Sequence, residues 1–272
     1  MHPFYRRSKF AAAAAAVLVS VFCLAAVPPA AAESRFRVDP LLDSILLGGS
    51  AALTAGSLLT SPADTNQPAA STINSIDAAL MFPYSEVLDQ AGTWTAIGML
   101  TVSGAAALGQ LDDVDALICY ALMYSEAFMF TYGAKEMMKD LFPRYRPWTY
   151  TSGGPADAAA ERNQSFPSGH TSYAFLGASF LSAVLLIDYA DQSWTPWAVT
   201  GSYAAAAAVA ASRVAAGEHF LTDVLTGAAL GSLFGWLVPM LHLADDDQQT
   251  AEASGGPVVK VTSGSVIFKL SY

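Results

Sequence analysis

The chain has 272 residues and a formal net charge of −10, with 53% hydrophobic and only 13% charged residues. About a quarter of the residues in an ordinary soluble domain are charged, so this chain either buries an unusual share of its surface or lies in lipid. The acidic balance argues against a nucleic-acid partner, because few basic side chains remain to neutralise a phosphate backbone.

The first 32 residues are typical of a secretory signal peptide. Arg6, Arg7 and Lys9 precede an apolar run over 10–27, and small residues at 30–32 offer a cleavage site. An uncleaved anchor helix is the alternative, but both predict that the chain leaves the cytoplasm. After cleavage, 10 basic residues would face 23 acidic ones, a net charge of −13.

Six apolar stretches follow, each near the length that crosses a bilayer. They cover residues 41–60, 94–111, 116–138, 173–189, 195–211 and 223–243. Their Ala, Gly, Ser and Thr content suits close helix packing in a membrane, and would equally suit a compact soluble bundle. We therefore expect an all-α fold, a bundle of about six apolar helices that forms one domain over 33–243.

The C-terminal segment, 244–272, has a different pattern. An acidic, Gly-rich linker precedes two short apolar runs, Val258–Val261 and Val266–Leu270, which flank the polar residues 262–265. This pattern predicts a short β-hairpin.

Two features oppose a model in which all six stretches cross the membrane. The acidic links at 112–115 and 188–194 would face the cytoplasm, against the positive-inside tendency. A chain delivered outside by its signal would also cross three times before Lys139, which would put Lys139 on the cytoplasmic side. We therefore expect either that one early segment does not cross the membrane, with 41–60 as the first candidate, or that the bundle does not span the membrane at all. The long apolar runs still favour a membrane.

Positive charge is concentrated in one region of the chain. Five cations fall within 28 residues: Lys135, Lys139, Arg144, Arg146 and Arg162. Lys135 and Lys139 share a helix face at spacing i,i+4, and Pro143 then stops the helix. An ammonium from Lys139 and a guanidinium from Arg146 would suit a phosphoryl group. Solvated loop charges are the alternative.

A second motif, 165–171, stands directly before an apolar helix and has the sequence Ser-Phe-Pro-Ser-Gly-His-Thr. Ser168 is a candidate N-cap, Gly169 permits close approach of a ligand to the backbone, and His170 projects from the same turn. Free amides at a helix N-terminus bind anions. The alternative is an ordinary capped helix that carries a histidine.

The third motif, 212–223, contains Arg213, Gly217, His219 and Asp223. Gly217 is expected to end a helix in the left-handed conformation. His219 and Asp223 are spaced i,i+4, so the carboxylate could accept the Nδ1 proton and leave Nε2 as a nucleophile. A structural His–Asp pair is the alternative.

Together the three motifs resemble the signature of the type 2 phosphatidic acid phosphatase and vanadium haloperoxidase superfamily. That signature is Lys-x6-Arg-Pro, then Pro-Ser-Gly-His, then Ser-Arg-x5-His-x3-Asp, and every fixed position is present in order. The resemblance covers about 139–223, and it implies a helical bundle built around a phosphate site.

The resemblance also implies roles for individual residues. His219 would attack phosphorus, Asp223 would orient it, and His170 would protonate the leaving oxygen and then serve the hydrolytic water. The phosphate oxygens would be held by Lys139, Arg146, Ser168, Gly169 and Arg213. No metal and no cofactor is expected, because fixed cations and amides supply the electrostatic stabilisation.

The expected activity is hydrolysis of a lipid phosphate or pyrophosphate, in the membrane of the cell envelope with the site facing the periplasm. A soluble periplasmic acid phosphatase for small esters, a vanadium haloperoxidase and an inactive scaffold are the alternatives. Outside the motifs, Glu126 lies in an apolar run. It is either a functional group or a hydrogen-bonded core residue on Lys135's side of its helix.

Overall fold

The computed structural model describes residues 34–60, 66–105, 113–151, 153–155 and 161–244, together with the backbone of two strands near the C-terminus. The expected signal peptide lies outside the described residues, so its cleavage stays a prediction.

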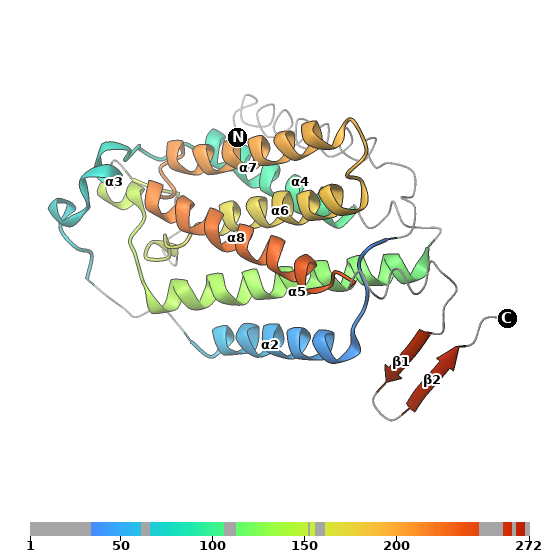
Figure 1. The fold of residues 1–272 in the computed structure, drawn as a ribbon. Coiled ribbons are helices and arrows are strands. Elements are labelled where there is room, and N and C mark those ends of the chain that lie inside the picture. Colours follow the sequence, from blue (N-terminus) through green and yellow to red (C-terminus); the bar gives the residue numbers. More distant parts are fainter. Residues whose placement is uncertain are drawn as a thin grey trace, which may run out of the picture.

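The described chain is mostly helical, and the expected all-α class is confirmed (Figure 1). The long helices are α2 (Pro40–Leu58), α4 (Glu86–Ala105), α5 (Val114–Leu141), α6 (Gly169–Asp188), α7 (Thr195–Ala215) and α8 (Leu221–Leu241). A short helix α3 (Ser75–Ala79) and single 3-10 turns at Ala70–Thr72 and Pro147–Tyr150 lie in the connections. Each long helix covers most of one of the six apolar stretches, and α4 begins earlier than its stretch because Glu86 and Asp89 interrupt the apolar pattern.

Local sequence explains several helix ends. Asp39 caps α2, with its carboxylate accepting the amides of Leu41 and Leu42 at 2.9 and 3.1 Å. Asp113 caps α5 by accepting the amide of Ala116 at 3.0 Å. Gly217 follows α7 with a φ of 69°, as expected for a glycine that ends a helix.

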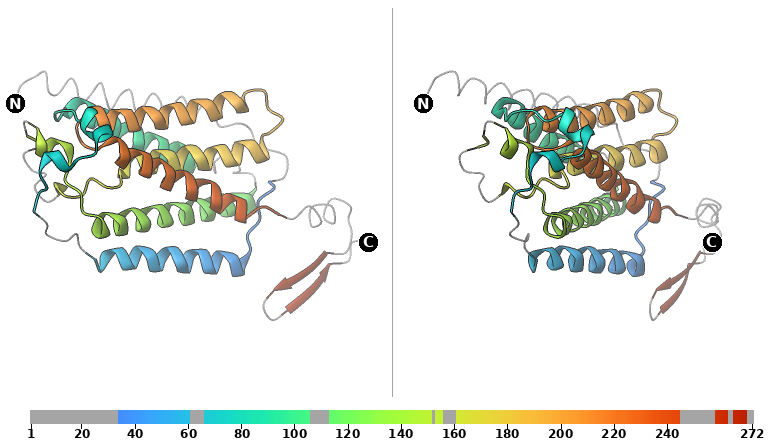
Figure 2. Two further views of the ribbon diagram at one scale, coloured as in Figure 1. Left: turned by 60° about the vertical axis from the view of Figure 1, so that its left-hand side comes forward. Right: turned by 90° about the vertical axis from the view of Figure 1, so that its left-hand side faces the viewer.

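Helix α6 forms the centre of the bundle. It packs against α4, α7 and α8, while α5 contacts α8 and α2 lies outermost along α5 (Figures 1 and 2). Of the 18 consecutive residues that make up the most apolar part of α6, 67% are buried, whereas the figure for α2 is 17%. The first turn of α6, which carries His170, is therefore held by helices on several sides.

The close packing of α6 on α8 depends on glycines at Gly227, Gly231 and Gly235. A Cβ atom at Gly231 would lie 2.0 Å from the carbonyl oxygen of Ser172 and 2.7 Å from the amide of Leu176. A real Cβ cannot approach backbone so closely, so glycine is required there. This contact brings the start of α8 beside the start of α6.

Consecutive long helices alternate in direction, so α2 and α5, which are separated by α4 in the chain, run parallel. Gly49 faces Phe130 and Gly56 faces Met137, so both helices advance toward the same end of the bundle. Helix α2 packs along α5 as a full helix, and whether 41–60 crosses a membrane stays a prediction. Residue 34 and the end of α5 with Lys139 therefore lie at opposite ends.

The outer surface of the bundle is apolar. Four helices, α2, α5, α6 and α8, are long and apolar enough to cross a membrane. Large apolar side chains are exposed on five helices: Leu41 (72%) and Ile45 (62%) on α2, Val87 (63%) on α4, Ile118 (52%) on α5, Trp197 (78%) on α7 and Leu225 (59%) on α8. Such a surface is compatible with lipid rather than water, and it indicates membrane association.

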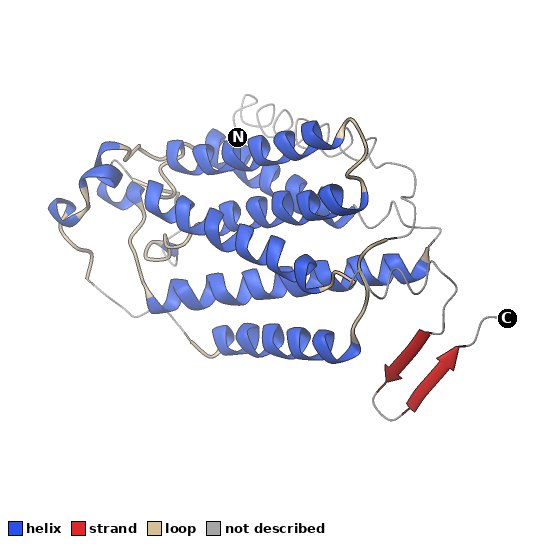
Figure 3. Cartoon of the chain, viewed as in Figure 1, coloured by secondary structure: helices blue, strands red, loops and turns tan. Residues whose placement is uncertain are grey.

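Two short strands follow the bundle. Strands β1 (Val258–Thr262) and β2 (Ser265–Lys269) pair antiparallel, with Val258 opposite Lys269 and Thr262 opposite Ser265 (Figure 3). The linker at 245–257 lies outside the described residues.

Candidate active site

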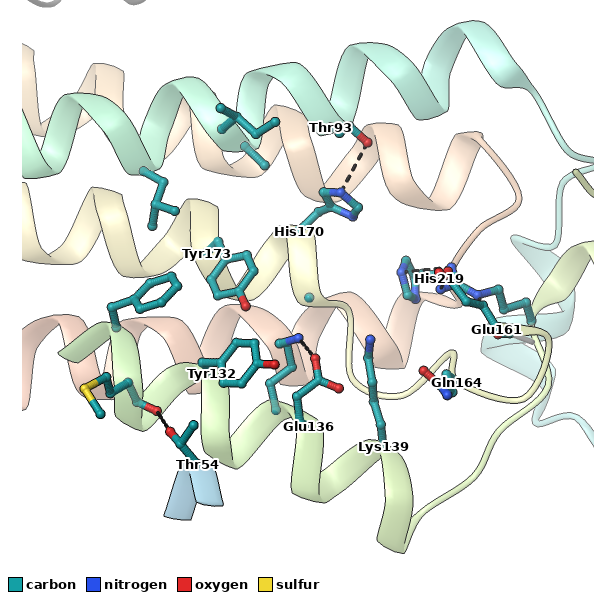
Figure 4. Close-up of a pocket in the computed structure, with 18 residues that line it drawn as sticks. Thr54, Thr93, Tyr132, Glu136, Lys139, Glu161, Gln164, His170, Tyr173 and His219 are labelled. Carbon is teal, nitrogen blue, oxygen red and sulfur yellow. Dashed lines mark hydrogen bonds and ion pairs between the residues drawn. The ribbon is translucent and has the colours of Figure 1, made fainter. Parts of the chain in front are cut away.

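A cavity of about 710 Å³ opens between α4, α5 and the first turn of α6 (Figure 4). Its lining is divided by chemistry. One part is charged or polar and includes Lys135, Glu136, Lys139, Arg146, Glu161, Gln164, His170 and His219. The other part is largely apolar and includes Ala96, Ile97, Leu100, Phe128, Met129, Tyr132 and Tyr173. The cavity can therefore hold an amphipathic molecule with an anionic head.

Two of the expected phosphate ligands, Lys139 and Arg146, line the polar part. Lys139 lies in the last turn of α5, one turn after Lys135, as their spacing predicts. Arg146 is 5% exposed, and its Nη1 lies 3.5 Å from Nε2 of His219. A group bound at His219 would thus meet at least one fixed guanidinium.

Glu218 interacts with two arginines next to the polar part of the cavity. Its carboxylate accepts from Nη1 of Arg146 and lies 3.6 Å from Nη2 of Arg213. Arg213 is 2% exposed, also pairs with Asp89, and does not line the cavity. Burial raises the pKa of Glu218 above its usual value, although the two guanidinium groups oppose this shift.

One ring nitrogen of His219, Nδ1, makes a backbone hydrogen bond, and the other, Nε2, lies near Arg146. Its Nδ1 lies 2.7 Å from the carbonyl oxygen of Ser165, so Nδ1–H donates and Nε2 keeps its lone pair. Burial, with the charges of Arg146, Arg213 and Lys139, holds the pKa of His219 well below its ordinary value. The ring is therefore neutral at pH 7, with a lone pair available for attack.

The i,i+4 spacing suggested a direct hydrogen bond between Asp223 and His219, but the structure does not form one. Oδ2 of Asp223 lies 3.8 Å from Nδ1, and that oxygen instead accepts the Ser165 hydroxyl at 2.6 Å and the Phe220 amide at 2.9 Å. The difference arises because Asp223 is in the first turn of α8, where its carboxylate is used by the open amides at the helix start. Asp223 therefore fixes Ser165, and Ser165 fixes the histidine.

Arg144 extends this network toward α3. Its guanidinium donates to Asp223 and to Asp77, the latter at 2.7 Å. Burial alone would raise the pKa of Asp77, but hydrogen bonds from Arg144 and Thr222 outweigh it and hold that pKa below its usual value. The ionised Asp77 anchors Arg144, so a short connecting helix supports the site.

The first turn of α6 contributes His170 and Gly169 to the cavity. Nε2 of His170 lies 3.2 Å from the hydroxyl of Thr93 on α4 (Figure 4). Ser168 occupies the N-cap position as expected, but its hydroxyl lies 3.0 Å from that of Thr171 and does not accept a backbone amide. Ser168 is fully buried and, like Arg213 and Asp223, is not part of the cavity lining.

The PAP2 superfamily matches residues 117–246, the segment that carries all three motifs. This segment belongs to the PAP2 superfamily. A lipid A 1-phosphatase of Porphyromonas gingivalis is 38% identical to this chain over 73 residues, 27% of the chain. The match spans only 15% of the length of that relative.

A crystal structure of a transmembrane PAP2-type phosphatidylglycerolphosphate phosphatase from Bacillus subtilis also resembles the chain. The identity is 23%, the match covers 73% of this chain and 94% of that chain, and the TM-score is 0.43.

The PAP2 segment thus brings the three motifs together from α5, the start of α6 and the start of α8. Five of the eight expected site residues line the cavity: Lys139, Arg146, Gly169, His170 and His219. The sequence did not single out Ser165 or Glu218, although both stand within the quoted motifs. Asp77 and Thr93 offered no signal, because each is at least 67 residues from its partner.

Glu126 does not lie on Lys135's side of the helix, so that expectation is wrong. Nine residues at 100° each place the two side chains on opposite faces of α5. Glu126 instead faces His242, with its Oε2 lying 3.5 Å from Nε2 of the ring.

Proposed function

We propose that the chain is a metal-independent phosphatase that transfers a phosphoryl group to His219 and then to water. The observation that carries the proposal is the state of this histidine, a buried neutral ring with Nδ1 bound to the Ser165 carbonyl and Nε2 beside Arg146. A neutral imidazole beside fixed cations can attack a phosphate dianion, whereas an imidazolium cannot.

In the first step, Nε2 of His219 forms a bond to phosphorus, and the bond from phosphorus to the ester oxygen breaks. His170, as an imidazolium that the bound phosphate dianion stabilises, donates its proton to the leaving alkoxide and becomes neutral. In the second step, water attacks phosphorus while His170 accepts a proton, and Nε2 leaves with its electron pair. Lys139 and Arg146 stabilise the charge on the equatorial oxygens throughout, with the Gly169 backbone at the helix start.

The substrate proposed is a lipid phosphate or lipid pyrophosphate. The two-part cavity supports this choice, because its polar end continues into a wall formed by Ile97 and Leu100 of α4 and Phe128 of α5. A soluble ester would leave this wall in contact with water. The apolar outer surface of the bundle places the same opening within reach of acyl chains.

A matched pair of variants tests the substrate class. Ile97 lines the cavity and is 48% exposed, and Ile118 is 52% exposed but does not line it. Ile97→Asp is expected to lower kcat/KM on phosphatidic acid in mixed micelles about tenfold or more, with little change on p-nitrophenyl phosphate. Ile118→Asp should change neither. Equal losses on both substrates with Ile97→Asp, or none on the lipid, would favour a soluble ester.

We further propose that the protein acts in the membrane of the cell envelope, with the cavity toward the periplasm. The apolar surface supports the membrane, and the export signal expected at 1–32 supports the envelope. If all six long helices span, a periplasmic cavity puts residue 34 on the cytoplasmic side, because it is at the other end of the bundle from Lys139. The segment 1–32 would then not export residue 34, so full export by this segment and a periplasmic cavity agree only if the six helices do not all span. Arg35 and Arg37 at that end agree with the positive-inside tendency.

A further inference from the structure

Three ionisable side chains meet on the side of the bundle away from the phosphate-binding residues. Asp43 comes from the first turn of α2, Glu126 from the middle of α5, and His242 from the residue after α8. Their exposed fractions are 4%, 0% and 2%. One ligand atom from each lies within 4.8 Å of the others. Glu126 is 13 residues before Lys139, about 20 Å along the helix, so this cluster is separate from the phosphate site.

The hydrogen bonds of His242 direct a lone pair into the cluster. Its Nδ1 lies 2.8 Å from the carbonyl oxygen of Val238, which can only accept, so Nδ1–H is the donor. The other nitrogen, Nε2, lies 2.8 Å from Oδ1 of Asp43 and 3.5 Å from Oε2 of Glu126. A bare Nε2 lone pair would repel both carboxylates, so a proton or a cation must lie between them. Histidine ligands of metals commonly donate their other N–H to a backbone carbonyl in this way.

A proton on Nε2 would satisfy only part of the cluster. It would serve Asp43 Oδ1, but Oδ2 of Asp43 and both oxygens of Glu126 are buried without a hydrogen-bond partner among the described residues. One imidazolium and two carboxylates would also leave a net charge of −1 in the protein interior, which is costly. A divalent cation with two carboxylates and a neutral imidazole gives a net charge of zero, and it can take the unpartnered oxygens as ligands.

We propose that Asp43, Glu126 and His242 bind a divalent transition-metal ion, of which Zn²⁺ is the probe of choice. One imidazole nitrogen and two carboxylates are a usual ligand set for such ions, and three protein ligands leave a position for water. The ion joins α2 to α5 and α8. Its role is structural, because α2 is the outermost helix and its packing within the bundle is mainly on α5.

The test uses the full chain without a histidine tag, purified in detergent, stripped with chelator and then incubated with Zn²⁺. We expect one zinc per chain after gel filtration, measured by atomic emission, and a rise in Tm of several degrees over the stripped protein. Glu126→Gln and Asp43→Asn are expected to lose both effects.

Two matched controls separate this site from other binding. His242→Gln should lose the zinc, whereas His219→Gln, at the proposed phosphate site, should keep it. Asp188→Asn changes a carboxylate at the same end of the bundle that is bound to Tyr120 and Ser34, and it should also keep the zinc. Failure of the wild-type chain to retain zinc would overturn the proposal, as would equal retention by Glu126→Gln. If metal-free Glu126→Gln has a higher Tm than zinc-treated wild type, the proposal is also contradicted. That result would mean that Glu126 is a buried carboxylate with no bound cation to offset its charge.

Discussion

Nδ1 of His219 lies 2.7 Å from the carbonyl oxygen of Ser165, and this contact, rather than one with Asp223, sets the tautomer of the proposed nucleophile. The Oδ2 of Asp223 lies 3.8 Å from the same nitrogen and bonds the Ser165 hydroxyl instead. The support of His219 is thus a backbone group, which substitution of side chains cannot remove directly.

Asp223→Asn should therefore be less harmful than loss of a carboxylate that touches its histidine, which costs about 10⁴-fold in rate. We expect a fall in kcat of about 10- to 100-fold, because the ring keeps its partner while the position of Ser165 loosens. The free energy of unfolding should fall by about 1–3 kcal/mol, since Arg144 loses one of its two carboxylates. Steady-state kinetics and thermal unfolding measure both quantities. A loss of 10⁴-fold or more would mean that Asp223 contacts His219 directly during the reaction.

Glu218 should give the enzyme an acidic pH optimum. Its carboxylate holds Arg146, and its pKa is raised by burial. As pH falls through that pKa, the carboxylate gains a proton, loses its charge and releases the guanidinium for substrate. The low pKa of His219 acts in the same direction, because it keeps the nucleophile neutral as pH falls below 7.

The variant Glu218→Gln is neutral at every pH and should raise kcat/KM at pH 7 by about tenfold while flattening the rise toward acid. The pH profile of kcat/KM on one soluble ester is the measurement. An unchanged profile would show that Glu218 does not compete with phosphate.

Gly231 should be intolerant of any side chain. A Cβ there would lie 2.0 Å from the Ser172 carbonyl oxygen, so Gly231→Ala must push α8 away from α6. We expect a loss of about 1–3 kcal/mol in stability together with reduced activity, because both helices begin at the site. Gly201→Ala on α7 is the matched control, since no atom lies within 4 Å of its Cβ, and it should be neutral or slightly stabilising. Equal Tm values for the two variants would contradict the packing described here.

The two ends of the bundle should be accessible from opposite sides of a membrane. In a Cys119→Ser background, Arg162→Cys marks the cavity end and Asp191→Cys marks the far end, and both positions are exposed. An impermeant maleimide added to cells with a permeable outer membrane should label position 162 alone. Labelling of position 191 alone would place the cavity in the cytoplasm, and labelling of both would mean that the bundle does not span.

The sequence was sufficient to predict the six helices and the meeting of the three motifs. Apolar length specifies helices directly, and the fixed spacing of Lys139, His170 and His219 around helix ends brings them to one place.

Chelation should not affect the proposed phosphate site, so we expect phosphatase activity to survive EDTA at temperatures well below the Tm. Activity abolished by EDTA and restored by Mg²⁺ would contradict a metal-independent reaction.

The sequence was insufficient wherever a contact depends on how two helices are rotated against each other. The i,i+4 spacing of His219 and Asp223 allowed a direct pair, but the open amides of α8 took the carboxylate. Glu126 could have faced either side of α5, and only the parallel packing of α2 brings Asp43 to it. Asp77 reaches Arg144 through a connection whose course no local pattern specifies.

The roles of the two histidines are the central claim. His170→Ala should lose about 10²–10⁴-fold in rate on a lipid phosphate, whose alkoxide needs a proton to leave. On p-nitrophenyl phosphate, formation of the phosphoenzyme should be much less affected, because p-nitrophenolate leaves as a stable anion. Hydrolysis of the intermediate should still be slow, since His170 also serves the attacking water, so the mutant should show a burst of product.

The most direct measurement is therefore rapid mixing of His170→Ala and His219→Ala with ³²P-labelled p-nitrophenyl phosphate, quenched in base, which preserves phosphohistidine. We expect His170→Ala to accumulate up to one labelled phosphate per chain, on a peptide that contains His219, and His219→Ala to accumulate none. Label retained by His219→Ala, or no label accumulated by His170→Ala, would contradict the proposed mechanism.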